Sequence, residues 1–296
     1  MDWLTQPFAL EVQRRALAEV VLAGGLGGLL GCYVVLRRLG FMSDAMSHAV
    51  LPGVVVAYLL AGLGSVLVGA LAAGVVAAIG VGLITRDRRV EHDAATGIML
   101  SATFALGVLL ISTLRSYATA LEDFLFGNVL LVSGEDLALT VVIGACVAAA
   151  LLVFHRRFLL RAFDPVLADA LGLNGLALDL LLLLLLAGTV VISLRAIGNI
   201  LVVAFLITPA ATARLLTERV PSMMAVSSLL GAGTGAVGMV LAYHLNVATS
   251  SFIVCLSTAI FLAVLVAEPR RGLLTRRLRA GAAPRRPSYT PAPHGH

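Results

Sequence analysis

The sequence predicts an all-α polytopic membrane protein with about nine spanning helices, although eight or ten would also fit. Three observations predict this class: 60% of the 296 residues are apolar, only 12% are charged, and the mean hydropathy is +1.02. Soluble domains carry about 25% charged residues. Because lipid cannot satisfy backbone polar groups, each span must be a helix that forms its own hydrogen bonds.

Nine apolar segments are long enough to cross about 30 Å of hydrocarbon at about 1.5 Å per residue. The second and third segments are separated only by a short turn at residues 62–64. Together they predict one transmembrane domain over residues 1–267. The segments cover residues 16–36, 44–62, 64–85, 94–114, 137–155, 175–194, 196–213, 222–243 and 246–267.

The distribution of arginine predicts the orientation in the membrane. All 21 basic residues are arginine, and 17 of them lie in alternate loops or in the C-terminal segment. Short loops rich in basic residues stay in the cytoplasm. The N-terminus is therefore expected outside and the C-terminus inside, which requires an odd number of spans. Residues 268–296 are expected to form a disordered, arginine-rich cytoplasmic tail.

Several protein classes are excluded by composition and motifs. The chain has no lysine, and a Walker A phosphate loop needs one, so the chain cannot hydrolyse ATP by itself and is not expected to be an enzyme. Its arginines flank apolar runs, as in membrane proteins, so no nucleic-acid partner is expected. An intramembrane hydrolase is disfavoured because H-E-x-x-H and G-x-S-x-G are both absent.

Asp44 and His48 are the strongest candidates for a functional site. Their spacing places a carboxylate and an imidazole on one face of a helix, one turn apart. This pair suits Mn²⁺, Fe²⁺ or Zn²⁺. Two ligands are too few for a complete site, but a two-fold dimer would supply two oxygens and two nitrogens. The alternatives are that Asp44 caps the helix and that His48 is a buried, hydrogen-bonded histidine.

Two prolines and one loop are further candidates for functional elements. Pro52 is expected to break the helix that carries Asp44 and His48, so that the ligand-bearing turn can face a pathway. Pro209 is expected to kink its helix, either for the pathway or only for packing. In the loop covering residues 156–174, Asp164 can cap a short helix with Pro165 in its first position.

The segment from Arg37 to Gly53 resembles the signature of the membrane permeases of the ABC-3 family, which are subunits of bacterial ATP-driven importers for manganese, zinc or iron. Phe124 to Asn128 is similar to the family's Phe-x-Phe-Gly-Asn/Asp block. Two further blocks follow in the family's order: one contains Phe163, Asp164, Pro165, Ala168 and Gly172, and the other runs from Gly198 to Ala213.

This resemblance implies a type II ABC importer-like permease in the bacterial cell membrane. It implies a homodimer that receives metal from an extracytoplasmic metal-binding lipoprotein and is driven by a separate cytoplasmic ATP-binding subunit. Asp44 and His48 would be the metal ligands, and Phe163, Asp164, Ala168 and Gly172 would couple to the ATPase. An interfacial helix lying on the membrane is the alternative for this last segment.

The expected cargo is manganese, with zinc or iron as alternatives, and no permanently bound cofactor is expected. The rival function is a secondary cation transporter driven by ion gradients. Few intramembrane carboxylates and no evident inverted halves count against it.

Overall fold

The computed structural model describes residues 11–84, 92–112 and 132–267. This part of the chain contains nine helices that are long and apolar enough to span a membrane, which confirms the predicted class and number. The block from Phe124 to Asn128 and the tail over 268–296 lie outside the described residues. The spanning helices are α2 (Glu11–Leu36), α3 (Gly40–Ala61), α4 (Val66–Ile84), α5 (His92–Ile111), α7 (Gly134–Val153), α10 (Gly175–Ile197), α11 (Asn199–Leu216), α12 (Val220–Leu245) and α13 (Thr249–Ala267).

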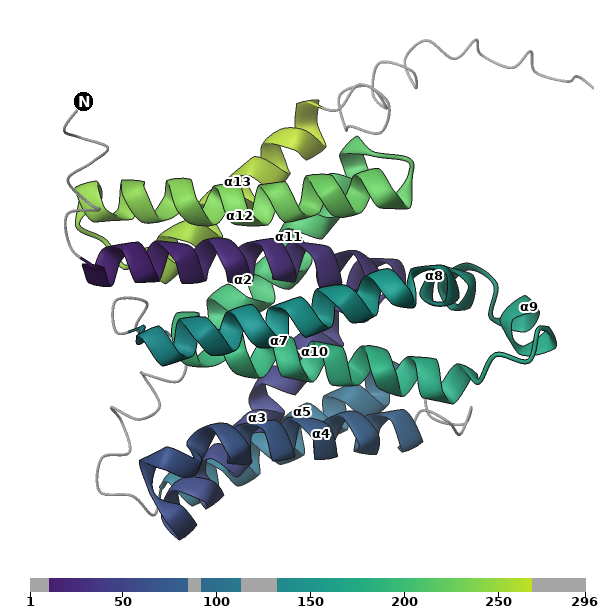
Figure 1. Cartoon of the computed structure of the whole chain (residues 1–296), viewed down its shortest axis with the longest axis horizontal. Helices are drawn as coiled ribbons and strands as arrows, with labels where there is room; N and C mark the ends of the chain where they lie inside the picture. The colour runs from purple at the N-terminus through teal and green to yellow at the C-terminus, as the bar shows by residue number, and fades with distance from the viewer. Residues whose placement is uncertain (1–10, 85–91, 113–131, 268–296) are drawn as a thin grey trace, which may run out of the picture.

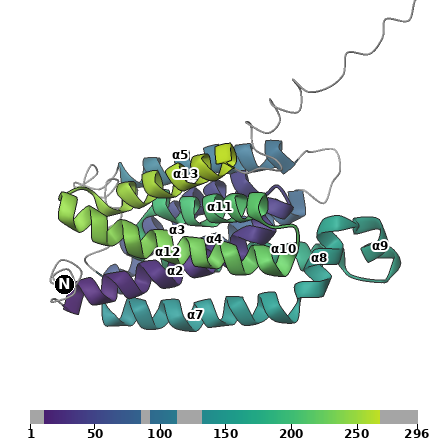
Figure 2. The same cartoon turned by 90° about the horizontal axis from the view of Figure 1, so that it is seen from above.

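The helices form two groups joined by a central pair. In Figure 1, α2, α11, α12 and α13 lie together on one side, α3, α4 and α5 lie on the other, and α7 and α10 run between them. The view from above places α7 on the face opposite α5 and α13 (Figure 2). A 3-10 turn, η2 (Leu63–Ser65), joins α3 to α4 at the predicted short turn.

Glycine allows α2 to lie directly against its neighbours. A Cβ on Gly24 would lie 2.5 Å from the carbonyl oxygen of Gly231 in α12, and a Cβ on Gly31 would overlap the carbonyl of Leu206 in α11. Such close backbone approach is how small residues drive helix association in membranes. These glycine contacts are formed within one chain, a point that the sequence could not decide.

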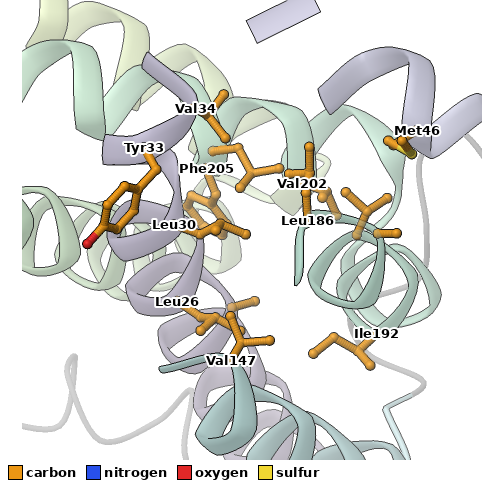
Figure 3. Close-up of a cluster of buried hydrophobic side chains, with 14 of the residues drawn as sticks. Leu26, Leu30, Tyr33, Val34, Met46, Val147, Leu186, Ile192, Val202 and Phe205 are labelled. Atoms are coloured by element: carbon orange, nitrogen blue, oxygen red, sulfur yellow. The ribbon is translucent and has the colours of Figure 1, made fainter. Parts of the chain in front are cut away.

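The main core lies where α2 meets α10 and α11. Leu30 of α2 lies beside Phe205 of α11, and Leu186 of α10 closes the cluster from the other side (Figure 3). All three side chains are fully buried or nearly so. This core fixes α11, whose first residues reach the candidate site described below.

The described part of α2 begins at Glu11, five residues before the predicted apolar segment, and Glu11 forms an exposed ion pair with Arg15. Glu19, which lies within the predicted segment 16–36, is fully buried in this helix. It accepts a hydrogen bond of 2.7 Å from the hydroxyl of Thr140 in α7. The helix α2 therefore contributes one buried carboxylate to the bundle.

Candidate metal site and coupling segment

Asp44 and His48 lie on the first turns of α3, which begins at Gly40. His48 Nε2 is 3.6 Å from Asp44 Oδ1, and the two side chains are 15% and 36% exposed, respectively. The two candidate ligands are thus adjacent, as their spacing predicted. The helix N-cap is Leu39, so the alternative in which Asp44 caps the helix is wrong.

Residues from two other helices contact His48. The amide Nδ2 of Asn199, the first residue of α11, lies 3.3 Å from His48 Nε2. The ring of Phe104 in α5 meets the imidazole edge to face, with 4.9 Å between centroids. His48 is therefore held inside the bundle where α3, α5 and α11 meet. Sequence reasoning missed Asn199, although it is a polar residue directly after Gly198 in an otherwise apolar run.

One copy of the chain offers an incomplete metal site. Among the described residues, no group of three or more His, Cys, Asp or Glu side chains could hold a metal ion. Asp44 and His48 provide one oxygen and one nitrogen donor, which suits a borderline divalent ion. Within the described part of the chain, a further ligand would have to be another residue type, and water or a second copy could supply others.

Pro52 does not break α3, contrary to the expectation from the sequence, because the helix continues through it to Ala61. Proline cannot donate the helical hydrogen bond to the carbonyl of His48, four residues earlier. Membrane helices tolerate such a loss where neighbouring helices pack closely. Here Gly53 provides that contact, since a Cβ at this position would overlap Gly69 of α4. Pro209 likewise lies inside a continuous helix, α11.

The turn between α2 and α3 fixes where the ligand helix begins. Leu39 N donates to Val34 O at 2.8 Å and Arg38 N donates to Val35 O at 3.2 Å, which is the Schellman pattern. The left-handed residue of that pattern is usually glycine, but here it is Arg38, with φ of +58°. The turn is thus well defined although its central residue is strained.

The predicted coupling segment forms two short helices, α8 (His155–Phe163) and α9 (Pro165–Ala170). They extend beyond the spanning helices at the end of the bundle where α2 finishes (Figure 1). Asp164 caps α9 by accepting a hydrogen bond of 2.9 Å from Leu167 N, with Pro165 in the first position, as predicted. Gly172 ends α9 with φ of +76° in a second Schellman turn.

The four predicted coupling residues differ in exposure. Phe163 is 66% exposed, whereas Ala168, on the inner face of α9, is fully buried. Asp164 and Gly172 define the two ends of α9 and are exposed. Two other apolar side chains of this region, Val166 and Leu171, are 79% and 64% exposed. Within the described part of the chain, the surface around α9 therefore exposes several apolar side chains beside the carboxylates of Asp164 and Asp169.

Ion pairs connect the coupling segment to the start of the ligand helix. Asp179, near the beginning of α10, accepts hydrogen bonds from Arg37 at the end of α2 and from Arg161 of α8, the latter at 3.2 Å. Arg161 also pairs with Asp169 of α9 at 3.1 Å. The hydrogen bond from Arg161 to Asp179 is the largest of the effects that raise the pKa of Arg161. We call Arg37, Asp179, Arg161 and Asp169 the four-residue network.

A second contact attaches α8 to α2. The hydroxyl of Tyr33 lies 2.6 Å from His155 Nδ1, and its ring meets Phe158 edge to face, with 5.5 Å between centroids. Tyr33 and Phe158 are both fully buried. The helix α8 is therefore packed onto α2 and is more than a helix resting on a membrane surface.

Fold and site together define a multi-pass membrane protein with an acid and imidazole pair inside its helix bundle. Residues 9–268 match the model of the ABC 3 transport family, and the chain belongs to this family. It is therefore a transport component of a bacterial membrane.

Named relatives align over most of their length. The chain is 41% identical to the manganese transport system membrane protein MntC of Halalkalibacterium halodurans, covering 89% of each chain. It is 38% identical to the manganese import system permease protein ScaB of Streptococcus gordonii, covering 90% of this chain and 95% of that one. A probable iron transport system membrane protein of Haemophilus influenzae is 36% identical, with 95% and 98% covered.

Solved structures show the same fold. PsaBC from Streptococcus pneumoniae in complex with Fab superposes with a TM-score of 0.81 at 34% identity, covering 95% of this chain and 99% of that chain. A metal-chelate type ABC transporter in an inward-facing conformation gives a TM-score of 0.68 at 19% identity, covering 86% and 89%. The second match supports the fold alone.

Proposed function

We propose that the protein is the permease subunit of an ATP-driven importer for divalent transition metal ions, with manganese as the first candidate and iron or zinc as alternatives. The observation that carries the proposal is the pairing of Asp44 Oδ1 with His48 Nε2 at 3.6 Å inside a membrane helix bundle. Ionisable residues at such positions mark ion pathways. The manganese and iron permeases among the relatives support this cargo class.

The working unit is a homodimer with the pathway between its copies. Among the described residues of one chain, Asp44 and His48 are the acid and imidazole donors at this site, so a two-fold axis beside α3 would double this set. Incomplete sites suit transport, because the ion must also leave. The orientation remains the one that the arginines predict, with the N-terminus outside and the C-terminus in the cytoplasm.

The chain works with two partners, an extracytoplasmic metal-binding lipoprotein and a separate cytoplasmic ATP-binding subunit. The second partner docks on the coupling segment, where Phe163 and the surface of α9 present exposed apolar side chains. In this role Asp164 and Gly172 set the ends of α9, and Ala168 packs it onto the segment below. Pro52 and Pro209 shape the helices on either side of the pathway.

Replacing either ligand tests this function directly. Asp44→Ala and His48→Ala should each abolish ATP-dependent manganese uptake into vesicles that contain the permease and its ATPase, while membrane insertion and ATPase binding persist. His244→Ala is the matched control, because this histidine lies in the last turn of α12 against Tyr243 and should leave uptake unchanged. Normal uptake in either ligand variant would refute the site. Uptake that continues without the ATPase would favour a secondary transporter.

A further inference from the structure

Asn199 is the polar residue in contact with His48 that the site described so far does not use. It is only 3% exposed and begins α11 directly after Gly198, whose φ is +80°. Its Nδ2 faces His48 Nε2, but its Oδ1 is buried with no hydrogen-bond partner among the described residues. A buried amide oxygen without a partner destabilises the folded protein, because it has lost its hydrogen bonds to water. Such a group in a native protein calls for an explanation, and an ion is one of them.

The spacing of the three side chains fits a shared ion. His48 Nε2 is 3.6 Å from Asp44 Oδ1 and 3.3 Å from the Asn199 amide. Divalent metals bind nitrogen and oxygen ligands at about 2.1 Å, so two ligands of one ion lie about 3.0 Å apart at a right angle and about 3.4 Å apart at a tetrahedral angle. The observed separations are close to these values. Small side-chain rotations would therefore bring all three groups onto one ion.

We propose that Asn199 is a third protein ligand of the transported metal, through Oδ1, and that it favours manganese over zinc. This inference rests on the proposed function. With no metal bound, the Asn199 Nδ2 donates to the lone pair of His48 Nε2. When the ion takes that lone pair, a half turn of the amide places Oδ1 beside the ion and removes the unpaired buried oxygen.

Coordination number gives Asn199 its effect on selectivity. Asp44 and His48 from two copies make four ligands, a number that suits tetrahedral zinc. Adding Asn199 from each copy makes six ligands, four oxygens and two nitrogens, which suits the octahedral, oxygen-rich preference of manganese. The amide is also neutral, so it adds a donor without adding negative charge. A neutral donor keeps the ion releasable, as a transport site requires.

The test compares Mn²⁺ and Zn²⁺ binding by the full-length permease purified with its ATPase. Asn199→Ala should weaken Mn²⁺ binding at least tenfold, by the scale seen for groups around metal sites, and should change Zn²⁺ binding much less. Asn199→Asp keeps the size and the oxygen donor, so it should retain Mn²⁺ binding even if the alanine variant folds poorly. X-ray absorption of bound manganese should show six ligands, two of them imidazoles.

Three results would overturn the inference: equal loss of both metals in Asn199→Ala, unchanged Mn²⁺ binding in Asn199→Ala, or loss of Mn²⁺ binding in a folded Asn199→Asp. Asp44→Ala and His48→Ala, measured in parallel, separate this outcome from failure of the proposed function. If those two variants lose Mn²⁺ while Asn199→Ala keeps it, only the role of Asn199 is wrong. If all three keep it, the metal site itself is wrong.

Discussion

Asp179→Asn is expected to loosen the attachment of the coupling segment to the rest of the permease, while the contacts of Tyr33 with α8 remain. The carboxylate of Asp179 is shared by Arg37, which ends α2, and Arg161, which belongs to α8. Asparagine keeps the size of the side chain but removes the charge that both guanidinium groups require. The change therefore affects the centre of the four-residue network and leaves the metal ligands untouched.

The size of the effect follows from the burial of the three side chains. Arg37 is 16% exposed, Asp179 28% and Arg161 19%. Exposed pairs contribute about 0–1 kcal/mol, whereas removing one partner of a buried pair costs about 3–5 kcal/mol. Because all three side chains keep some exposure to solvent, we take the upper end of the range for exposed pairs, about 1 kcal/mol for each lost pair. The total of about 2 kcal/mol corresponds to about a 30-fold shift in the docking equilibrium of the segment.

Hydrogen exchange and coupled transport measure this shift. In Asp179→Asn, amides of α8 and α9 should exchange faster, and metal uptake per ATP hydrolysed should fall. Asp169→Asn is the matched control, because Asp169 is 59% exposed and, among the described residues, forms its ion pair with Arg161 alone. It should change exchange by less than about 1 kcal/mol. Unchanged exchange in Asp179→Asn, or an equal effect in the control, would refute a connecting role for the network.

Two further predictions concern glycines. Gly31→Leu should prevent correct packing of α2 on α11, because even a Cβ at this position would overlap the carbonyl of Leu206. Size-exclusion chromatography in detergent should then show loss of the monodisperse peak. A folded, active variant would contradict this prediction. Gly172→Val should destabilise the turn that ends α9 by about 1–2 kcal/mol, because φ at this position is +76°. Metal uptake per ATP hydrolysed should fall as a result. Gly172→Asn serves as the control, since asparagine adopts this backbone conformation more readily.

Hydropathy was enough to predict the spanning helices. Lipid leaves no other way to satisfy the backbone, so each apolar segment became one helix, with small shifts at the ends. The largest shift is in α2, whose described residues begin at Glu11, five residues before the predicted apolar segment. Burial of Glu19 could not be predicted from the sequence, because it depends on the packing of α7, which brings Thr140 alongside.

Local spacing predicted the parts of the site that lie on one helix. Asp44 and His48 are one turn apart, and Asp164 with Pro165 forms a cap, so both features depend only on neighbours in sequence. Asn199 and Asp179 could not be assigned in this way. Their partners are 151 and 142 residues away in sequence, and only the packing of α10 and α11 brings them together.

The proposed dimer explains how a tightly packed chain that carries only part of a metal site could transport an ion. Backbones of α2 and α12 touch at Gly24 and Gly231, so these helices cannot slide without breaking close contacts. Motion is then expected at the boundary between copies, where the proposed site lies. If both copies contribute three ligands, moving them apart halves the coordination of the ion without deforming either chain. Release then needs only side-chain rotations within each chain and no sliding of its helices, so a permease with a tightly packed interior could still deliver a metal ion.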